Sequence, residues 1–187
     1  MIELSTLRDL VTISGVLIAL SYYILTLRNQ KRTRQAQLLM SLYEKYSSEE
    51  SREKSMEIQL LEWNTLDEFF DKYSYVNNPK AWSAWEAKAS FFHGIGVLLE
   101  ADMIDTMLLD RLLTNSVNRH WNVLRMGQVL VEWRKRMSNE RSDYWVDPRH
   151  DEEFFNNIRD STFYGFDYLY NRLVEYRKTH PIKTTQL

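Results

Sequence analysis

The chain has 187 residues, which allows one compact domain and little else. Its 24 Lys and Arg nearly balance 26 Asp and Glu, and a net charge of −2 argues against a nucleic-acid binder, which usually has a strongly basic surface. The absence of cysteine excludes disulfides, cysteine-ligated metals and thiol nucleophiles, while 5 Gly and 3 Pro disfavour a turn-rich all-β fold.

The first predicted element is an apolar helix over residues 10–27, LVTISGVLIALSYYILTL, which contains no charged residue. As a helix it spans about 27 Å, close to the roughly 30 Å hydrocarbon core of a bilayer. A buried core helix is the alternative, but such a helix usually has a polar face. A cleaved signal peptide is disfavoured because Arg28 follows where small residues should precede cleavage. We therefore expect a single transmembrane helix.

A basic cluster follows this segment and consists of Arg28, Lys31, Arg32 and Arg34. Residues 1–27 carry a net charge of −1 and residues 28–36 a net charge of +4. The positive-inside rule then predicts a cell-membrane protein with its N-terminus outside and its C-terminal domain in the cytoplasm. The four cations are the predicted membrane-surface contacts, worth about 1 kcal/mol each beside anionic head groups. A specific lipid site there is a further hypothesis.

The helix is expected to continue through the basic stalk to about Tyr46, because no proline precedes residue 76 and Gly15 is the only glycine in that stretch. An apolar stripe with helical spacing follows the basic cluster: Ala36, Leu39, Tyr43 and Tyr46. This stripe needs a partner, which we expect to be the rest of the same chain rather than a second copy.

Capping and breaking signals predict further helices in chain order. Their expected ranges are 48–63, 65–73, 79–100, 105–113, 116–137 and 148–177, with a loop at 141–147. The predicted fold is all-α: an N-terminal transmembrane helix that continues into a stalk, followed by a bundle of five or six helices. The predicted parts are the anchor and stalk (1–36), the cytoplasmic bundle (37–180) and a tail (181–187).

Two compositional features bear on packing in this bundle. Gly94 and Gly96 lie within one predicted helix, where small residues let a neighbouring helix approach closely. Paired rings recur along the chain, at Phe69/Phe70, Phe91/Phe92 and Phe154/Phe155. A thick aromatic core is the favoured interpretation of these pairs, and a protein-binding groove is the alternative.

The sequence offers little for metal chemistry. The histidines are scattered and lack metal-ligand spacing: His93, His120, His150 and His180. Within residues 147–153, His150 and Glu153 could share a helix face and hold a divalent cation, but a solvated acidic helix start explains them better. No Glu precedes a His by three residues, so a bundle di-iron site is excluded.

Catalytic motifs are also missing, since neither GxxxxGK[ST] nor GxSxG occurs. We therefore expect no catalytic, cofactor-binding or metal residues and no cofactor. Two further basic groups could contact an anionic partner or the membrane, although solvated charge suffices to explain them. They are Arg134, Lys135, Arg136 and Arg141, and then Arg172, Arg177, Lys178 and Lys183.

Several stretches together resemble the domain-of-unknown-function family numbered 4760, a bacterial and archaeal group without an established activity. They are Arg28–Arg34, Ser48-Glu49-Glu50-Ser51-Arg52, Phe91–Leu99, Met103-Ile104-Asp105 and Trp121. The similarity covers roughly residues 10–140 and is structural rather than catalytic. It implies a membrane helix, a basic stalk and a compact helical domain, and it implies no active site.

The favoured function is therefore a membrane-anchored interaction or accessory protein, with the lipid bilayer, a protein partner or a second copy as partners and no nucleic acid. The alternative is an enzyme or ligand sensor with a polar pocket that holds His93 or His120 beside an Asp or Glu. A third reading, a toxin-like or stress effector at the membrane, rests on no particular residue.

Overall fold

The computed structural model describes residues 4–139 and 162–181, and every regular element in these ranges is a helix. The elements are α1 (Leu4–Ser47), α2 (Glu49–Gln59), α3 (Leu66–Tyr73), α4 (Pro79–Glu100), α5 (Thr106–Asn118), the π-helical turn η1 (Arg119–Val123), α6 (Met126–Asn139) and α8 (Tyr164–Thr179). Six α-helices thus follow α1 in the described ranges. The predicted all-α class, with a long N-terminal helix and a bundle of five or six helices, is confirmed.

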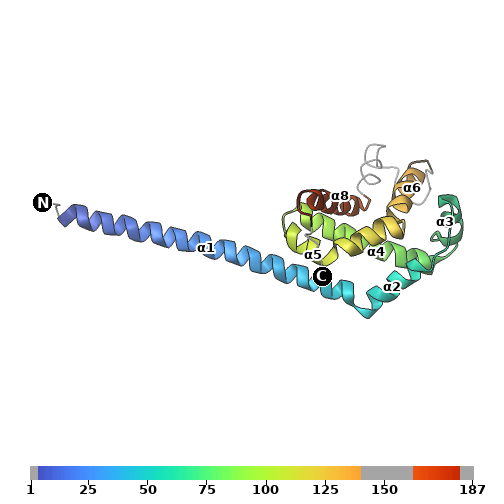
Figure 1. Ribbon diagram of the computed structural model, residues 1–187, viewed down its shortest axis with the longest axis horizontal. Helices are drawn as coiled ribbons and strands as arrows, with labels where there is room; N and C mark the ends of the chain where they lie inside the picture. Colours follow the sequence, from blue (N-terminus) through green and yellow to red (C-terminus); the bar gives the residue numbers. More distant parts are fainter. Residues whose placement is uncertain (1–3, 140–161, 182–187) are drawn as a thin grey trace, which may run out of the picture.

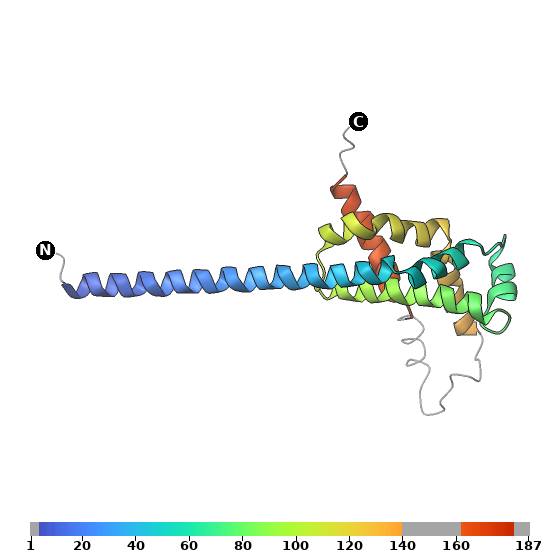
Figure 2. The same ribbon diagram turned by 90° about the horizontal axis from the view of Figure 1, so that it is seen from below.

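Helix α1 is continuous over 44 residues and is therefore about 66 Å long. Figures 1 and 2 show its N-terminal half leaving the bundle as a rod that touches no other described element. The large apolar side chains from Val11 to Leu27 are 47–73% exposed. Among the described helices, α1 alone is long and apolar enough to cross a membrane, and none of its apolar window is buried. The alternative of a buried core helix is therefore wrong for this segment.

The C-terminal part of α1 packs on the bundle, as the apolar stripe predicts. Leu39 is buried, and the Tyr46 ring stacks on Phe91 with 5.7 Å between the ring centroids. Closer to the apolar segment, the Gln35 amide donates a 3.0 Å hydrogen bond to the carbonyl oxygen of Asp102, and the Lys31 ammonium pairs with the Asp102 carboxylate. The stalk is thereby tied to the turn between α4 and α5.

Helix α4 lies at the centre of the bundle and packs most extensively against α8 and then against α2. Gly96 makes the contact with α8 possible, because a Cβ atom there would lie 1.7 Å from the carbonyl oxygen of Gly165. The predicted close approach is therefore confirmed at Gly96. It is wrong for Gly94, where a Cβ atom would meet nothing within 4 Å.

The aromatic pairs supply the core rather than an exposed groove. Phe69 and Phe70 are both buried and meet edge to face at 5.5 Å. Phe92 is fully buried and stacks on Phe166 at 4.9 Å, while Phe91 is half-buried. Such ring pairs add about 0.5–1.5 kcal/mol each beyond the burial of their area. The core interpretation is confirmed for these two pairs, and Phe154/Phe155 lies outside the described residues.

The predicted helix starts are confirmed by side-chain caps. The capping pairs, each an oxygen accepting from a backbone N–H, are Ser48 with Ser51, Thr65 with Glu68, Asn78 with Ala81, and Asp105 with Leu108. The C-terminal ends of the helices are predicted less accurately than their starts. Helix α2 stops at Gln59 rather than Trp63, and α5 continues to Asn118 rather than stopping at Leu113.

The predicted continuous helix over 116–137 is wrong, because the chain breaks after η1. Arg125 has a φ of 56°, in the left-handed region that non-glycine residues seldom adopt. Its guanidinium lies 3.5 Å from the centre of the Trp63 ring and donates a 3.3 Å hydrogen bond to the Trp63 carbonyl. This contact favours the break, and it joins residues 62 positions apart.

The C-terminal prediction is only partly covered by the structure. The loop at 141–147, the helix start at Pro148 and the tail at 182–187 lie outside the described residues. Helix α8 follows Phe163, which has a φ of 54°, and its end at Thr179 agrees with the predicted stop at His180-Pro181.

Candidate functional site

A group of polar side chains lies inside the bundle where α1, α2, α4 and η1 meet. We call it the junction cluster, and its members are Tyr46, Ser51, Ser55, Lys88 and His120. Ser51 and Ser55 are one turn apart on α2 and half-buried, whereas Lys88 and His120 are only 3% and 2% exposed. Buried titratable groups are uncommon outside functional sites and structural networks, so this cluster is the first candidate.

Lys88 is a buried cation without a carboxylate partner in the described chain. Its Nζ donates a 2.6 Å hydrogen bond to the Ser51 Oγ and lies 5.0 Å from the centre of the Tyr46 ring. Burial, together with the smaller effect of the nearby Lys54 charge, lowers the pKa of Lys88 to about 8. The ammonium is therefore held by a hydroxyl and a ring face, which compensate only part of its lost hydration.

His120 lies beside this pair and is also shielded from water. Its Nδ1 is 2.8 Å from the carbonyl oxygen of Ser116, so in the neutral ring Nδ1 carries the proton and donates. Its Nε2 then faces the Ser55 Oγ at 3.4 Å. Burial lowers the pKa of His120 to about 4, against the opposing effect of the Ser116 carbonyl. At neutral pH, His120 is uncharged.

Chemically, a serine hydroxyl beside an amine of lowered pKa is the pairing used by Ser–Lys nucleophiles. Here, however, Lys88 and His120 are almost fully enclosed, and no member of the junction cluster lines the open groove along α1 or the one between α5 and α8. A substrate could reach Lys88 only if α1 or α2 separated from α4, although Ser51 itself is half-buried. The cluster in this form is a polar joint between helices rather than an accessible site.

The predicted polar pocket around a histidine and an acid is not formed. No described Asp or Glu bonds to His120, whose side-chain partners are Ser116 and Ser55. The Nδ1 of His93 accepts a 3.0 Å hydrogen bond from the backbone N–H of Gly165, and burial lowers the pKa of His93. His93 thus helps to fix α8 on α4. Among the described residues, no group of His, Asp and Glu side chains could hold a metal ion, and residues 147–153 lie outside them.

The basic cluster after the apolar segment lies on the surface of α1, and all four side chains are exposed. Lys31 is already paired with Asp102. In the described chain, the guanidinium groups of Arg28, Arg32 and Arg34 form no ion pair. Three of the four predicted membrane-surface residues are therefore free to contact an anionic surface.

Other basic residues are engaged within the fold. Arg134 pairs with Asp167 and donates to the Thr162 carbonyl, and Arg177 pairs with buried Asp110. Arg136 pairs with Asp67 and Glu132 and stacks on Phe70. Arg134, Arg136 and Arg177 each connect two helices through these ion pairs. The expectation that they are only solvated charges is therefore wrong. Arg141 and Lys183 lie outside the described residues.

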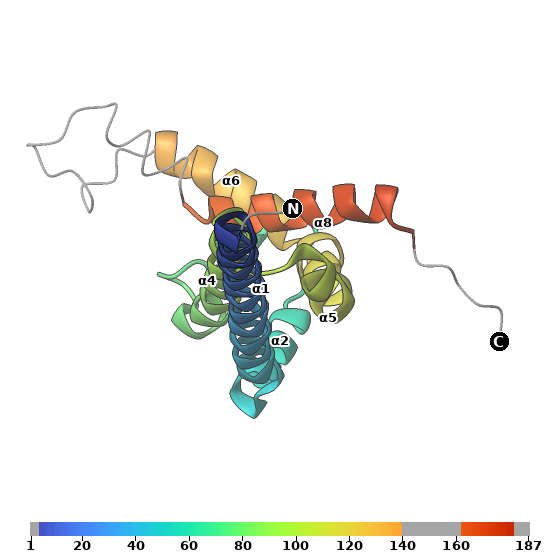
Figure 3. The same ribbon diagram turned by 90° about the vertical axis from the view of Figure 1, so that its left-hand side faces the viewer.

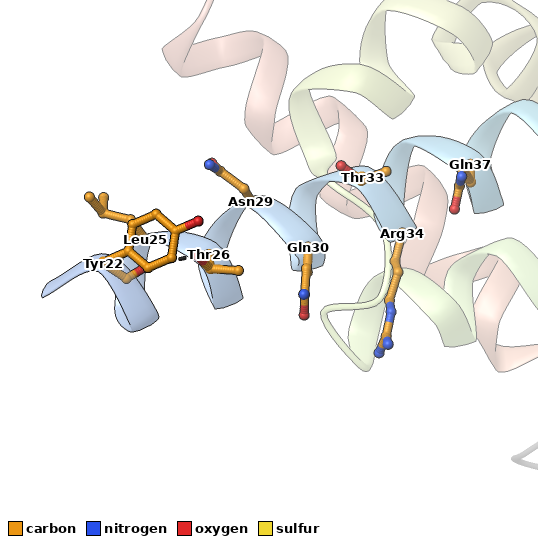
Figure 4. A pocket seen from close by; sticks show the side chains of 8 residues that line it. All are labelled: Tyr22, Leu25, Thr26, Asn29, Gln30, Thr33, Arg34 and Gln37. Carbon is orange, nitrogen blue, oxygen red and sulfur yellow. Dashed lines mark hydrogen bonds between the residues drawn. The ribbon is translucent and has the colours of Figure 1, made fainter. Parts of the chain in front are cut away.

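Open grooves on the described surface include one along α1 and one between α5 and α8. The first follows α1 alone and is drawn in Figure 4; its lining is Tyr22, Leu25, Thr26, Asn29, Gln30, Thr33, Arg34 and Gln37. The second lies between α5 and α8 and is lined by Thr114, Val117, Asn118, Tyr170, Leu173, Val174, Arg177 and Lys178. Neither groove contains a histidine or a carboxylate.

Sequence reasoning missed Lys88 and both serines of the junction cluster. A signal for Lys88 exists, because it follows Trp85 by three residues and precedes Phe92 by four, within the apolar stripe of its helix. The serines give no such signal, since their distance to Lys88 depends on how α2 packs on α4.

Comparison of the chain with family models, with curated proteins and with solved structures gives no match. The similarity to the family numbered 4760 therefore stays a prediction, and the candidate sites rest on the geometry of this chain.

Proposed function

We propose that this protein is a single-pass membrane protein whose helical bundle is held at the cytoplasmic face and binds a protein partner without catalysing a reaction. The observation that carries the proposal is the exposed apolar half of α1. Nine large aliphatic side chains between Val11 and Leu27 are at least 47% exposed. Transferring them from water into hydrocarbon would gain on the order of 10 kcal/mol or more, which is ample for anchoring.

The charge pattern supports the proposed orientation. Arg28, Arg32 and Arg34 stand directly after the apolar segment, without acidic partners in the described chain. Each would gain about 1 kcal/mol near an anionic cytoplasmic leaflet. This gain favours a cytoplasmic bundle and an N-terminus on the other side.

The contacts of the stalk support a bundle that lies close to the lipid. Lys31 pairs with Asp102, and Lys31 is four residues, or about 6 Å along the helix, beyond Leu27. Figure 3 views the molecule from the N-terminal side of α1, where α5, α8 and α4 are seen around it. Met103, in the turn between α4 and α5, is 50% exposed, and Met107, in the first turn of α5, is 42% exposed. Both would lie near the lipid head groups.

A non-catalytic role is supported by the burial of Lys88 and His120 in the junction cluster and by the lining of the two grooves, which contains no histidine and no carboxylate. The groove between α5 and α8 combines apolar Val117, Leu173 and Val174 with polar edges. Grooves of this composition commonly accept a helix of another protein.

The alternative function, an enzyme or ligand sensor with a site between the helices, is favoured by one observation, the 2.6 Å contact between Lys88 and Ser51. A serine-reactive fluorophosphonate probe separates the two proposals. We expect no labelling of the purified full chain. Labelling that is lost in Ser51→Ala and retained in Ser55→Ala would favour the enzyme.

The anchoring proposal is tested with the full chain in a bacterial host. We expect the protein in the membrane fraction after alkaline carbonate washing, with a C-terminal fluorescent fusion active and a C-terminal alkaline phosphatase fusion inactive. Replacing Leu17, Leu20 and Ile24 by Gln should release the chain, whereas the matched triple change at exposed Met56, Leu60 and Val76 of the bundle should not. Recovery of the unchanged chain in the carbonate wash would overturn the proposal.

A further inference from the structure

Helix α1 has two unlike faces at the point where its apolar segment ends. The bundle covers the side of Gln35 and Leu39. At 100° per residue, Thr33 and Gln37 point about 120° and 160° away from Leu39. Both are exposed, so the groove they line in Figure 4 lies on the side of α1 that the bundle leaves uncovered.

This outer face is polar but almost uncharged. The side-chain amides of Asn29, Gln30 and Gln37 are exposed and make no hydrogen bond within the described structure. By contrast, Arg28 and Arg32 lie eleven and seven residues before Leu39 and therefore share its side of the helix. The cations thus gather on the bundle side, and Arg34, at the edge of the groove, is its only charge.

The same face continues into the apolar segment. Thr26 and Tyr22 precede Gln30 at four-residue steps, and the Thr26 hydroxyl donates a 2.9 Å hydrogen bond to the Tyr22 carbonyl, drawn as a dashed line in Figure 4. Ala19 and Gly15 follow at steps of three and four. A Cβ atom on Gly15 would meet nothing within 4 Å, so the helix surface there is open to a neighbour.

We propose that a second copy of this chain packs in parallel along this face of α1, from Gly15 to Gln37. The inference rests on the proposed membrane anchoring. A helix that packs on this face must pass from hydrocarbon to water at the same depth as α1. This is because the face of α1 changes at that depth from small and apolar residues to free side-chain amides. A parallel copy meets this condition by symmetry, since each residue then lies near its own counterpart.

The chemistry of the face also fits its own copy. Amide groups donate and accept at once, so Asn29 and Gln30 can pair with the same groups of the partner helix. Gly15 and Ala19 allow two backbones to approach closely, as small residues do in membrane helix pairs. An antiparallel copy would place these amides against the apolar segment, where an unpaired polar group is costly.

The chain has no cysteine, so single cysteines can map the interface by disulfide cross-linking in native membranes. We expect Thr26→Cys, Thr33→Cys and Gln37→Cys to form dimers on mild oxidation. Arg28→Cys and Arg32→Cys, matched in depth but on the bundle side, should remain at least fivefold less cross-linked. Equal cross-linking at all five positions, or none in membrane-integrated protein, would overturn the proposal, as would an adduct with a different protein.

A second pair of variants tests the close approach. Gly15→Leu should lower the cross-linking of the Thr33→Cys chain by roughly threefold or more, because it adds bulk where the helices meet. Val16→Leu adds bulk one residue away, about 100° around the helix, and should leave the cross-linking unchanged. Equal effects of the two changes would contradict the assigned face.

The two proposals fail in different ways. If carbonate washing releases the chain and the cross-links persist, the membrane anchor is wrong, although the two helices still associate along this face. If the chain stays in the membrane and no cross-link forms, the anchor stands and the pair is wrong.

Discussion

The two halves of α1 contain similar apolar residues with opposite surroundings. Leu25 is 57% exposed, whereas Leu39, fourteen residues later in the same helix, is 2% exposed. Both belong to an uninterrupted helix, so local structure does not separate them. The difference lies in what they face: Leu39 meets other helices of the bundle, and Leu25 meets no described part of the chain. The bundle core is thus buried by contacts within the chain, whereas the apolar segment of α1 is left for lipid or another protein to cover.

The largest difference in the free energy of unfolding should appear when a ring in the bundle core is compared with an exposed aliphatic side chain in the apolar half of α1. Phe92→Ala removes a fully buried ring and should lower the free energy of unfolding by about 3–5 kcal/mol. Ile18→Ala, at a side chain that is 70% exposed, should change it by less than about 0.5 kcal/mol. Urea unfolding in mild detergent, followed by tryptophan fluorescence, measures both. Similar losses for the two variants would show that the apolar half of α1 folds as part of the core.

A second contrast uses two glycines that lie two residues apart on α4. Gly96→Ala places a Cβ atom 1.7 Å from the Gly165 carbonyl oxygen, so α4 and α8 must separate. We expect a loss of about 3 kcal/mol in the free energy of unfolding, at the upper end of overpacking effects. Gly94→Ala meets no atom and should be neutral or stabilising by up to about 1 kcal/mol. The same unfolding assay applies, and a destabilising Gly94→Ala would contradict the packing described here.

The junction cluster makes the stability of the bundle depend on pH above neutrality. Burial lowers the pKa of Lys88 in the folded state to about 8, below its unfolded value of about 10.4. The folded state therefore binds this proton less tightly, and stability should rise as pH increases from about 8 to 10. The expected rise is on the order of 2–3 kcal/mol.

Lys88→Met removes the titrating group while keeping much of the side-chain volume. The variant should lose this rise and be at least as stable as the parent chain near neutral pH. Thermal unfolding at several pH values gives the comparison, with exposed Lys80→Met as the control. An unchanged pH profile in Lys88→Met would assign the rise to other groups.

His120 produces the smaller effect, on the acid side. Its pKa falls to about 4 on folding, from about 6.5 in the unfolded chain. As pH drops below about 6.5, the unfolded state takes up the proton first, so stability should fall by about 2 kcal/mol by pH 5. His120→Gln should flatten this part of the profile, and exposed His180→Gln should not. An equal slope in both variants would contradict the burial of His120.

Local chemistry explains which features could be predicted from the sequence. The helix starts at Ser48, Thr65, Asn78 and Asp105 were predicted because a cap depends on residues only three positions apart. The exposed basic residues after the apolar segment were likewise predicted from their order along the chain. The same reasoning failed at Arg125, where the helix breaks although nothing in the neighbouring sequence requires it.

The helical class, the position of the apolar segment and the charge pattern that follows it can all be predicted from the amino-acid sequence, since they depend on composition and short-range spacing. The packing of the helices was needed to see that Lys31 meets Asp102, that Lys88 meets Ser51, and that one face of α1 remains uncovered. The paired residues lie 71 and 37 positions apart. Contacts over such separations depend on how whole helices pack, because each side chain is placed by the helix that carries it.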